Sequence, residues 1–325
     1  MAVIVGIDEA GYGPVLGPLV VAAAVFDAPD SPGDTGSSPP ADLWASLAPG
    51  VARAGQPARG RVSIADSKWL HQGAGRFERL ERNVLATCAL ALPLEFETFT
   101  QWLGIPPAHL ADGEPWYARG CPGLPIEADV ETVGAMQSTF AQATAAAGLT
   151  LRGVVVSLTQ PWRFNRLVAA TDNKARALWS LSAEVLERAI DGAAGGRVSV
   201  TMDKHGGRSH YADPLQQTFP LVAVDTLCET PAESRYRLAT GAGAEVDLTF
   251  REKADAASLP VALASMYAKY VREVFMHQFN VWWQTRAGDV APTAGYWTDY
   301  QRWSAEMREF LAALDLPPEK YIRSR

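Results

Sequence analysis

The sequence is poor in cysteine and has no basic residue near its start. Its three cysteines lie far apart, at Cys88, Cys121 and Cys228. An odd number at this spacing fits neither a disulfide framework nor a cysteine-based zinc site. The first Lys or Arg is Arg53, so the apolar run at 14–26 lacks the basic flank of a signal peptide, and it is shorter than the ~18 residues of a membrane span. These absences predict a soluble, cytoplasmic protein.

Basic charge is also scarce over the whole chain. The 325 residues carry 29 Lys and Arg against 36 Asp and Glu, a formal net charge of −7. Because nucleic-acid binding relies on phosphate neutralisation by Lys and Arg, any such function must depend on a local site. The apolar content of 48% excludes a wholly disordered chain.

Apolar periodicity predicts an alternation of strands and helices. Strands are expected at 3–8, 19–26, 151–158 and 197–203, with a β-rich stretch at 221–250. Helices are expected at 76–92, 126–147 and 175–190, and a long helix is expected to begin near Ser258 with Pro260 in its first turn. Between 29 and 40, nine of twelve residues are Pro, Gly or Ser, which is typical of a flexible surface loop.

Four carboxylates stand where strands are expected to end. Asp8 and Glu9 close the first strand, Asp203 closes a later one, and Asp255 lies between a β-rich stretch and the long helix. Taken singly, each is an ordinary strand-end or pre-helix acid. Gathered at one edge of a sheet, the four would repel one another unless cations lay among them. Oxygen ligands suit Mg²⁺ or Mn²⁺, and two such ions can support phosphodiester cleavage.

The segment around the first two acids resembles a known signature. Residues Gly6-Ile7-Asp8-Glu9-Ala10-Gly11-Tyr12-Gly13-Pro14 look like the opening motif of ribonuclease HII. Further blocks similar to that family follow in its order: Asp66-Ser67-Lys68; Thr201-Met202-Asp203; Lys253-Ala254-Asp255, with Ser265 and Lys269 in the adjoining helix; and Gly295-Tyr296-Trp297-Thr298. The ordered set is more specific than any one block.

The resemblance implies a fold and a domain organisation. The fold is an α/β one, an RNase H-like mixed β-sheet flanked by helices, with insertions and a helical C-terminal part. One enlarged domain is expected over 1–325, with a flexible insertion at 27–60 and a β-rich insertion at 226–250.

The resemblance also implies an activity. It is an endonuclease that cuts the RNA strand of RNA–DNA hybrids, or nicks duplex DNA on the 5′ side of an embedded ribonucleotide. Two Mg²⁺ or Mn²⁺ ions would be held by the four acids Asp8, Glu9, Asp203 and Asp255. The residues implied to contact substrate are Gly11, Tyr12, Gly13, Lys68, Lys253, Ser265, Lys269 and Tyr296.

The chain departs from the family's pattern at positions that concern the substrate. Tyr12 stands where the family has Arg or Lys, Lys204 where it has Gly, and Trp297 where it has Pro. Lys68 fits a surface lysine as well as a phosphate contact, and Tyr296 fits a core residue as well as a substrate contact. Two alternatives therefore stay open: a nuclease of this fold with a structure-specific DNA substrate, or a non-catalytic nucleic-acid-binding relative.

Overall fold

The computed structural model describes residues 1–29, 42–111, 113–118, 122–191, 196–206, 208–239, 245–288, 290–314 and 316–324, without the side chain of Lys68. Most of the glycine- and proline-rich stretch at 29–40, and 240–244 of the expected β-rich insertion, lie outside the described residues. Of the stretch 226–250, residues 226–229, 233–239 and 245–250 form strands, as its β-rich composition predicts.

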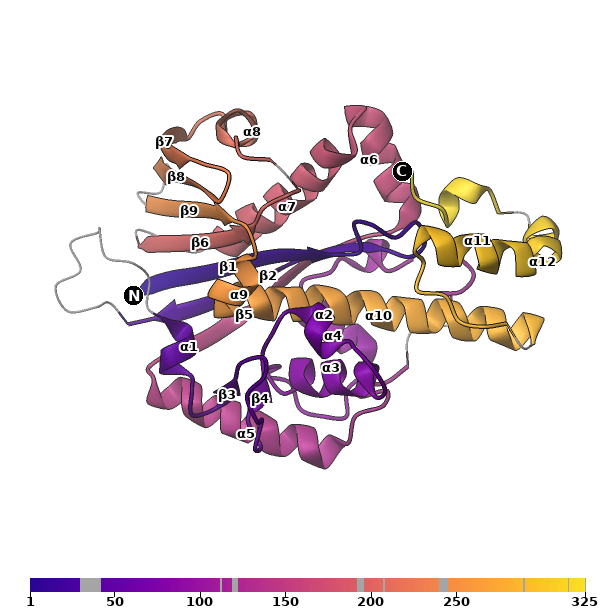
Figure 1. Cartoon of the computed structure of the whole chain (residues 1–325), viewed down its shortest axis with the longest axis horizontal. Coiled ribbons are helices and arrows are strands. Elements are labelled where there is room, and N and C mark those ends of the chain that lie inside the picture. The colour runs from indigo at the N-terminus through magenta and orange to yellow at the C-terminus, as the bar shows by residue number, and fades with distance from the viewer. Residues whose placement is uncertain are drawn as a thin grey trace.

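A seven-stranded mixed sheet forms the centre of the molecule (Figure 1). Its order is β5-β2-β1-β6-β9-β8-β7, and a separate two-stranded sheet joins β3 to β4. The bounds are β1 Ala2–Ala10, β2 Leu19–Ala28, β3 Val51–Ala52, β4 Val62–Ser63, β5 Thr150–Thr159, β6 Arg197–Asp203, β7 Ala223–Glu229, β8 Glu233–Ala239 and β9 Glu245–Arg251. Strands β1, β6 and β9 are parallel, whereas β2, β5 and β8 run antiparallel to their neighbours. The predicted fold class, an α/β fold with a mixed sheet flanked by helices and a helical C-terminal part, is confirmed.

Helices cover both faces of the sheet (Figure 1). Their bounds are α1 Leu43–Ser46, α2 Ser67–Leu70, α3 Arg76–Leu85, α4 Phe96–Trp102, α5 Val130–Ala146, α6 Pro161–Thr171, α7 Lys174–Ile190, α8 Ala212–Thr218, α9 Ala254–Ala257, α10 Leu259–Ala287, α11 Trp297–Glu306 and α12 Arg308–Ala313, with 3₁₀ turns at Pro107–His109 and Pro318–Lys320. None of the described helices has the length and apolarity needed to span a membrane.

Side-chain alternation along β1 divides the core into two halves. Ile4 and Ala10 pack on the side of α10, whereas Val5 and Ile7 pack on the side of α7. Helix α10 approaches β1 unusually closely, because a Cβ atom on Gly6 would lie 2.1 Å from the backbone carbon of Pro260. The missing side chain of Gly6 therefore lets the start of the long helix rest directly on the central strand.

Most predicted elements form near their expected bounds. The long helix begins at Leu259, after Ser258 and with Pro260 in its first turn. The helix expected at 76–92 ends at Leu85, because the chain turns there and the Thr87 hydroxyl donates to the carbonyl of Val84 at 2.8 Å.

A buried glutamate joins the helical middle of the chain to α10. Glu81 on α3 is fully buried, and its two oxygens accept four hydrogen bonds. The donors are the N–H groups of Ile126 (2.8 Å), Glu127 (2.7 Å) and Ala128 (2.8 Å) and the hydroxyl of Tyr270 (2.7 Å). Burial of this charge is thus balanced by donors from two distant segments.

Candidate active site

Asp8 and Asp203 lie side by side at the carboxyl ends of two parallel strands. Strand β1 pairs with β6 in a register that places Ile7 beside Met202, so the next residue on each strand is one of these acids. Asp8 lies on the α10 side of the sheet, four residues after Ile4, and there it accepts a hydrogen bond from Ser265 of α10. The two predicted acids thus share one face of the sheet.

The surroundings of Asp8 disfavour a negative charge. Burial raises the pKa of Asp8 well above its ordinary value, and the charges of Glu9 and Asp203 raise it further. The hydrogen bonds from Ser265 and from the Glu9 N–H, which lies 2.8 Å from Oδ1, act in the opposite direction. Burial and like charge together disfavour the charged form of Asp8, and a cation at this point would offset both.

The last predicted acid, Asp255, lies in the connection from β9 to α10. Asp203 Oδ1 accepts the N–H of Ala254 at 2.9 Å, which fixes the start of α9 against the end of β6. Asp255 is in the first turn of α9, and its Oδ1 accepts the N–H of Ala256 at 2.9 Å. Lys253 makes the tight turn into α9 with a left-handed φ of 53°, a conformation that a lysine adopts at a cost.

Glu9 projects to the other side of the sheet, because consecutive strand residues face opposite ways. Its charge raises the pKa of Tyr12, together with burial, and it also acts on Tyr211. Glu9 therefore lies at the same strand end as Asp8, with its side chain on the opposite face of the sheet.

Within the described part of the chain, no three His, Cys, Asp or Glu side chains are gathered into a ready-made metal cluster. The donor chemistry nevertheless fits a hard divalent cation, since every acid at this edge offers carboxylate oxygen and Asp8 is surrounded by like charge. The backbone hydrogen bonds to Asp203 and Asp255 each use one Oδ1 lone pair, and a carboxylate has about four acceptor positions. Those bonds orient the acids and leave room for ligation.

The glycine turn that follows β1 lies beside the acids, and buried side chains hold it from the interior of the protein. Gly11 has a φ of 93°, which favours glycine, and a Cβ there would lie 2.7 Å from the Arg272 side chain. Arg323 donates to the carbonyls of Gly11 and Pro14, and Arg272 donates to the carbonyl of Leu16 at 3.0 Å. Both arginines are almost fully buried, so they hold the turn from the inside of the protein.

The outer side of the turn is open. Among the described residues, the N–H groups of Tyr12 and Gly13 have no hydrogen-bond partner. Tyr296 has 54% of its surface exposed and lies against Gly13, since a Cβ on that glycine would be 3.7 Å from the tyrosine ring. The sequence left Tyr296 open between core and surface, and the structure places it on the surface beside the turn.

The remaining predicted residues fall in two places. The buried hydroxyls of Ser265 and Ser67 are hydrogen-bonded at 3.1 Å, so the Asp66-Ser67-Lys68 motif adjoins Asp8, although the Lys68 side chain lies outside the described part of the structure. Lys269 forms an ion pair with Glu273 at 2.6 Å, one helical turn further along α10. Lys253 is exposed at the start of α9.

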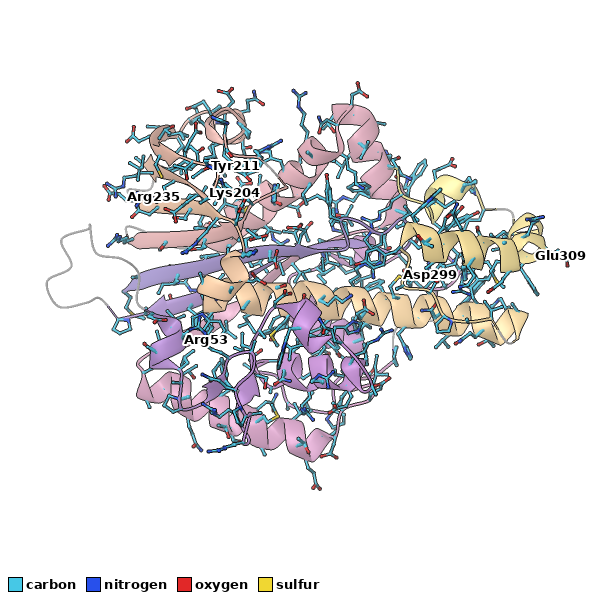
Figure 2. All side chains as sticks on the ribbon, in the orientation of Figure 1. Arg53, Lys204, Tyr211, Arg235, Asp299 and Glu309 are labelled. Atoms are coloured by element: carbon cyan, nitrogen blue, oxygen red, sulfur yellow. The ribbon has the colours of Figure 1, made fainter. Side chains whose placement is uncertain are left out.

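Sequence reasoning missed a cation beside Tyr12. The ammonium of Lys174, the first residue of α7, lies 4.7 Å from the centre of the Tyr12 ring. No sequence signal connects two residues so far apart in the chain. By contrast, Lys204, which follows Asp203, donates to the carbonyls of Thr230 (2.7 Å) and Pro231 (2.9 Å) and so secures the β7–β8 turn (Figure 2).

No family model matches this chain, and no curated protein matches it. Similar solved structures include ribonuclease HII from Archaeoglobus fulgidus in its complex with PCNA, with 16% identity, coverage of 99% of this chain and 94% of that chain, and a TM-score of 0.42. Bst-RNase HIII in complex with Mn²⁺ has 15% identity, 99% and 66% coverage, and a TM-score of 0.45. Ribonuclease H2 from Pyrococcus horikoshii has 16% identity, 98% and 92% coverage, and a TM-score of 0.39. Likenesses this distant decide nothing about the activity of this chain.

Proposed function

We propose that this protein is a metal-dependent endonuclease of the ribonuclease HII type, acting on RNA–DNA hybrids or on ribonucleotides embedded in duplex DNA. One observation carries the proposal: Asp8 is partly buried beside Asp203 and Glu9, at the carboxyl ends of parallel strands and next to an open glycine turn. A cluster of like charges is costly to a fold and is typical of a functional site.

Asp8, Asp203 and Asp255 would hold Mg²⁺ or Mn²⁺, with Glu9 at the rim. When bound, such an ion polarises a phosphodiester and acidifies a water molecule. The chain's own contribution is placement: Ser265 orients Asp8, and the Ala254 N–H orients Asp203.

Recognition of the sugar would fall to the glycine turn. The outward N–H groups of Tyr12 and Gly13 can donate to a 2′-hydroxyl, the group that distinguishes RNA from DNA. The exposed ring of Tyr296 beside Gly13 offers an apolar surface for the ribose. Lys174, stacked on Tyr12, offers the positive charge that position 12 itself lacks.

The test is cleavage of a duplex that contains a single ribonucleotide, with an all-DNA duplex and a full hybrid beside it. We expect a nick that requires Mg²⁺ or Mn²⁺, requires the ribonucleotide, and is lost in Asp203→Asn. Glu131→Gln, which removes one exposed acid in the first turn of α5, is the control and should cut normally. Equal cleavage of the all-DNA duplex would instead identify a structure-specific DNA nuclease, and cleavage by Asp203→Asn would overturn the proposed site.

A further inference from the structure

A groove lies along the sheet, and one of its lining residues, Arg251, is paired with Asp203 of the proposed active site. A cavity of about 540 Å³ lies over β6, β9 and β8 on the α10 side, walled by α1 and by the junction of α9 with α10. Arg197, Ser199 and Thr201 of β6 line it, and these alternate residues share a face with Asp203, which is next in the series. The floor of the groove therefore leads into the carboxylate edge.

Cross-strand pairing sets the order of side chains along this floor. Asp203 is paired with Arg251 of β9, Thr201 with Thr249, and Ser199 with Asp247. On β8, Arg235 is beside Thr249 and Arg237 is beside Asp247. Successive rows thus carry hydroxyl and guanidinium groups, with Arg251 directly next to a proposed metal ligand.

The arginines of the groove keep donors for a ligand. Asp247 accepts from Nε of Arg237 at 2.8 Å, and Glu233 lies 3.2 Å from Nε of Arg235. Among the described residues these pairings leave the terminal Nη groups of Arg235 and Arg237 without a hydrogen-bond partner, and Arg251 has no ion pair. The carboxylates thereby orient the guanidinium forks, the geometry that suits phosphate oxygens.

The third carboxylate of the lining is occupied by its own helix. Asp42 caps α1 by accepting the N–H groups of Trp44 and Ala45, at 3.0 and 3.4 Å. Four guanidinium groups, those of Arg197, Arg235, Arg237 and Arg251, therefore line the groove against three carboxylates, and Arg197 is paired with Asp247 at 3.2 Å. Arg235 and Arg237 also reach solvent, with 53% and 38% of their side chains exposed (Figure 2 labels Arg235 on β8).

We propose that this groove binds the phosphodiester backbone of the nucleic acid on one side of the cleaved bond. The six-residue step from Arg197 to Asp203 spans roughly 20 Å of strand, which matches about six phosphates of one strand in a duplex. This inference rests on the proposed function and extends it, because it assigns a substrate-binding role to β8 and β9, within a region whose role the sequence leaves open.

Binding measured in EDTA, where no bond is cut, tests the groove separately from catalysis. Fluorescence anisotropy would compare a short duplex, with one central ribonucleotide, to the same duplex extended by about six base pairs on one side or on the other. For the wild-type protein we expect one of the two extensions to strengthen binding by about tenfold, and we expect the salt dependence of log Kd to steepen.

The decisive variant is Arg235→Ser/Arg251→Ser. We expect this variant to bind the extended duplex less than about twofold more tightly than the short duplex. The slope of log Kd against log salt concentration should fall by about 2, because two phosphate contacts are lost. The control is Arg152→Ser/Arg308→Ser, which removes the same charge at the opposite edge strand and at α12 and should keep the full gain. Thermal unfolding shows whether each variant is folded. The single variant Arg251→Ser should lose about a third to a half of the increase in log affinity that the extended duplex gives the wild type.

The proposed role of the groove would be overturned if the double variant kept the full gain in affinity, or if neither extension strengthened binding by the wild type. Failure of the proposed function is a different result: a wild-type protein that shows the extension effect but makes no metal-dependent nick. Nicking without an extension effect would leave the active site in place and remove the groove.

Discussion

Two carboxylates contact the same long helix and have opposite surroundings. Glu81 meets α10 through Tyr270, and all four of its close partners donate hydrogen bonds. Asp8 meets α10 through Ser265, but Glu9 and Asp203 oppose its charge. The first carboxylate is satisfied by hydrogen bonds from the protein, whereas the second faces like charge, which a bound cation would offset. The partners of a buried acid, more than its burial, separate a structural role from a functional one.

Asp8→Asn should have the largest effect and should separate activity from stability. We expect ribonucleotide-dependent cleavage to fall on the order of a thousandfold, or ~4 kcal/mol of transition-state stabilisation. Unfolding in urea should show unchanged or higher stability, by up to about 1 kcal/mol, because the change removes a like charge from the cluster. A variant that is several kcal/mol less stable but still active would give Asp8 the structural role of Glu81.

Glu81→Gln should show the reverse pattern. The amide keeps one acceptor oxygen and turns an NH₂ group toward N–H donors, so we expect a loss of about 3 kcal/mol in the free energy of unfolding. Cleavage per folded molecule should be unchanged at low temperature. Glu78→Gln on the same helix breaks only an ion pair with Arg82 at 2.9 Å and should cost less than about 0.5 kcal/mol. A loss of activity without a loss of stability in Glu81→Gln would contradict the comparison.

His71, which follows α2 and lies 3.5 Å from Glu273 of α10, should give the smallest effect, seen through pH. Burial lowers the pKa of His71 from 6.5 to about 4, against the opposing charge of Glu273. The unfolded chain therefore binds the proton more readily, so stability is full above pH 6.5 and is lost as the pH falls toward 4. We expect a loss of up to about 2 kcal/mol between pH 7 and 5.

His71→Gln should flatten this part of the pH–stability curve, whereas the same change at exposed His210 should not. The measurement is chemical unfolding across the pH range. Equal curves for the wild type and His71→Gln would show that the histidine is not held in its neutral form by the fold.

Local patterns predicted the strands of the central sheet and four of the helices, but they did not predict which residues meet across long sequence distances. Strand β6 forms over 197–203 as its alternation indicates, and Ser258 and Pro260 mark the start of α10. Asp8 and Asp203 were identified by motif, and only the register of β1 and β6 makes them neighbours. The hydrogen bonds of Glu81, the stacking of Lys174 on Tyr12 and the arginine rows of the groove depend on tertiary pairing, for which one sequence has no periodic signal.

The guanidinium of Arg323 and the carbonyl of Gly11, which it holds, are 312 residues apart in the sequence. The Arg323 N–H also donates to the carbonyl of Val15 at 2.8 Å, and Leu16 forms a β-bridge with Ile322. During synthesis on the ribosome, the central strands can pair long before these contacts exist, and until then only Arg272 of α10 can hold the glycine turn. The proposed nuclease would thus complete the bracing of its substrate-reading surface only after all four of its proposed carboxylates have been synthesised.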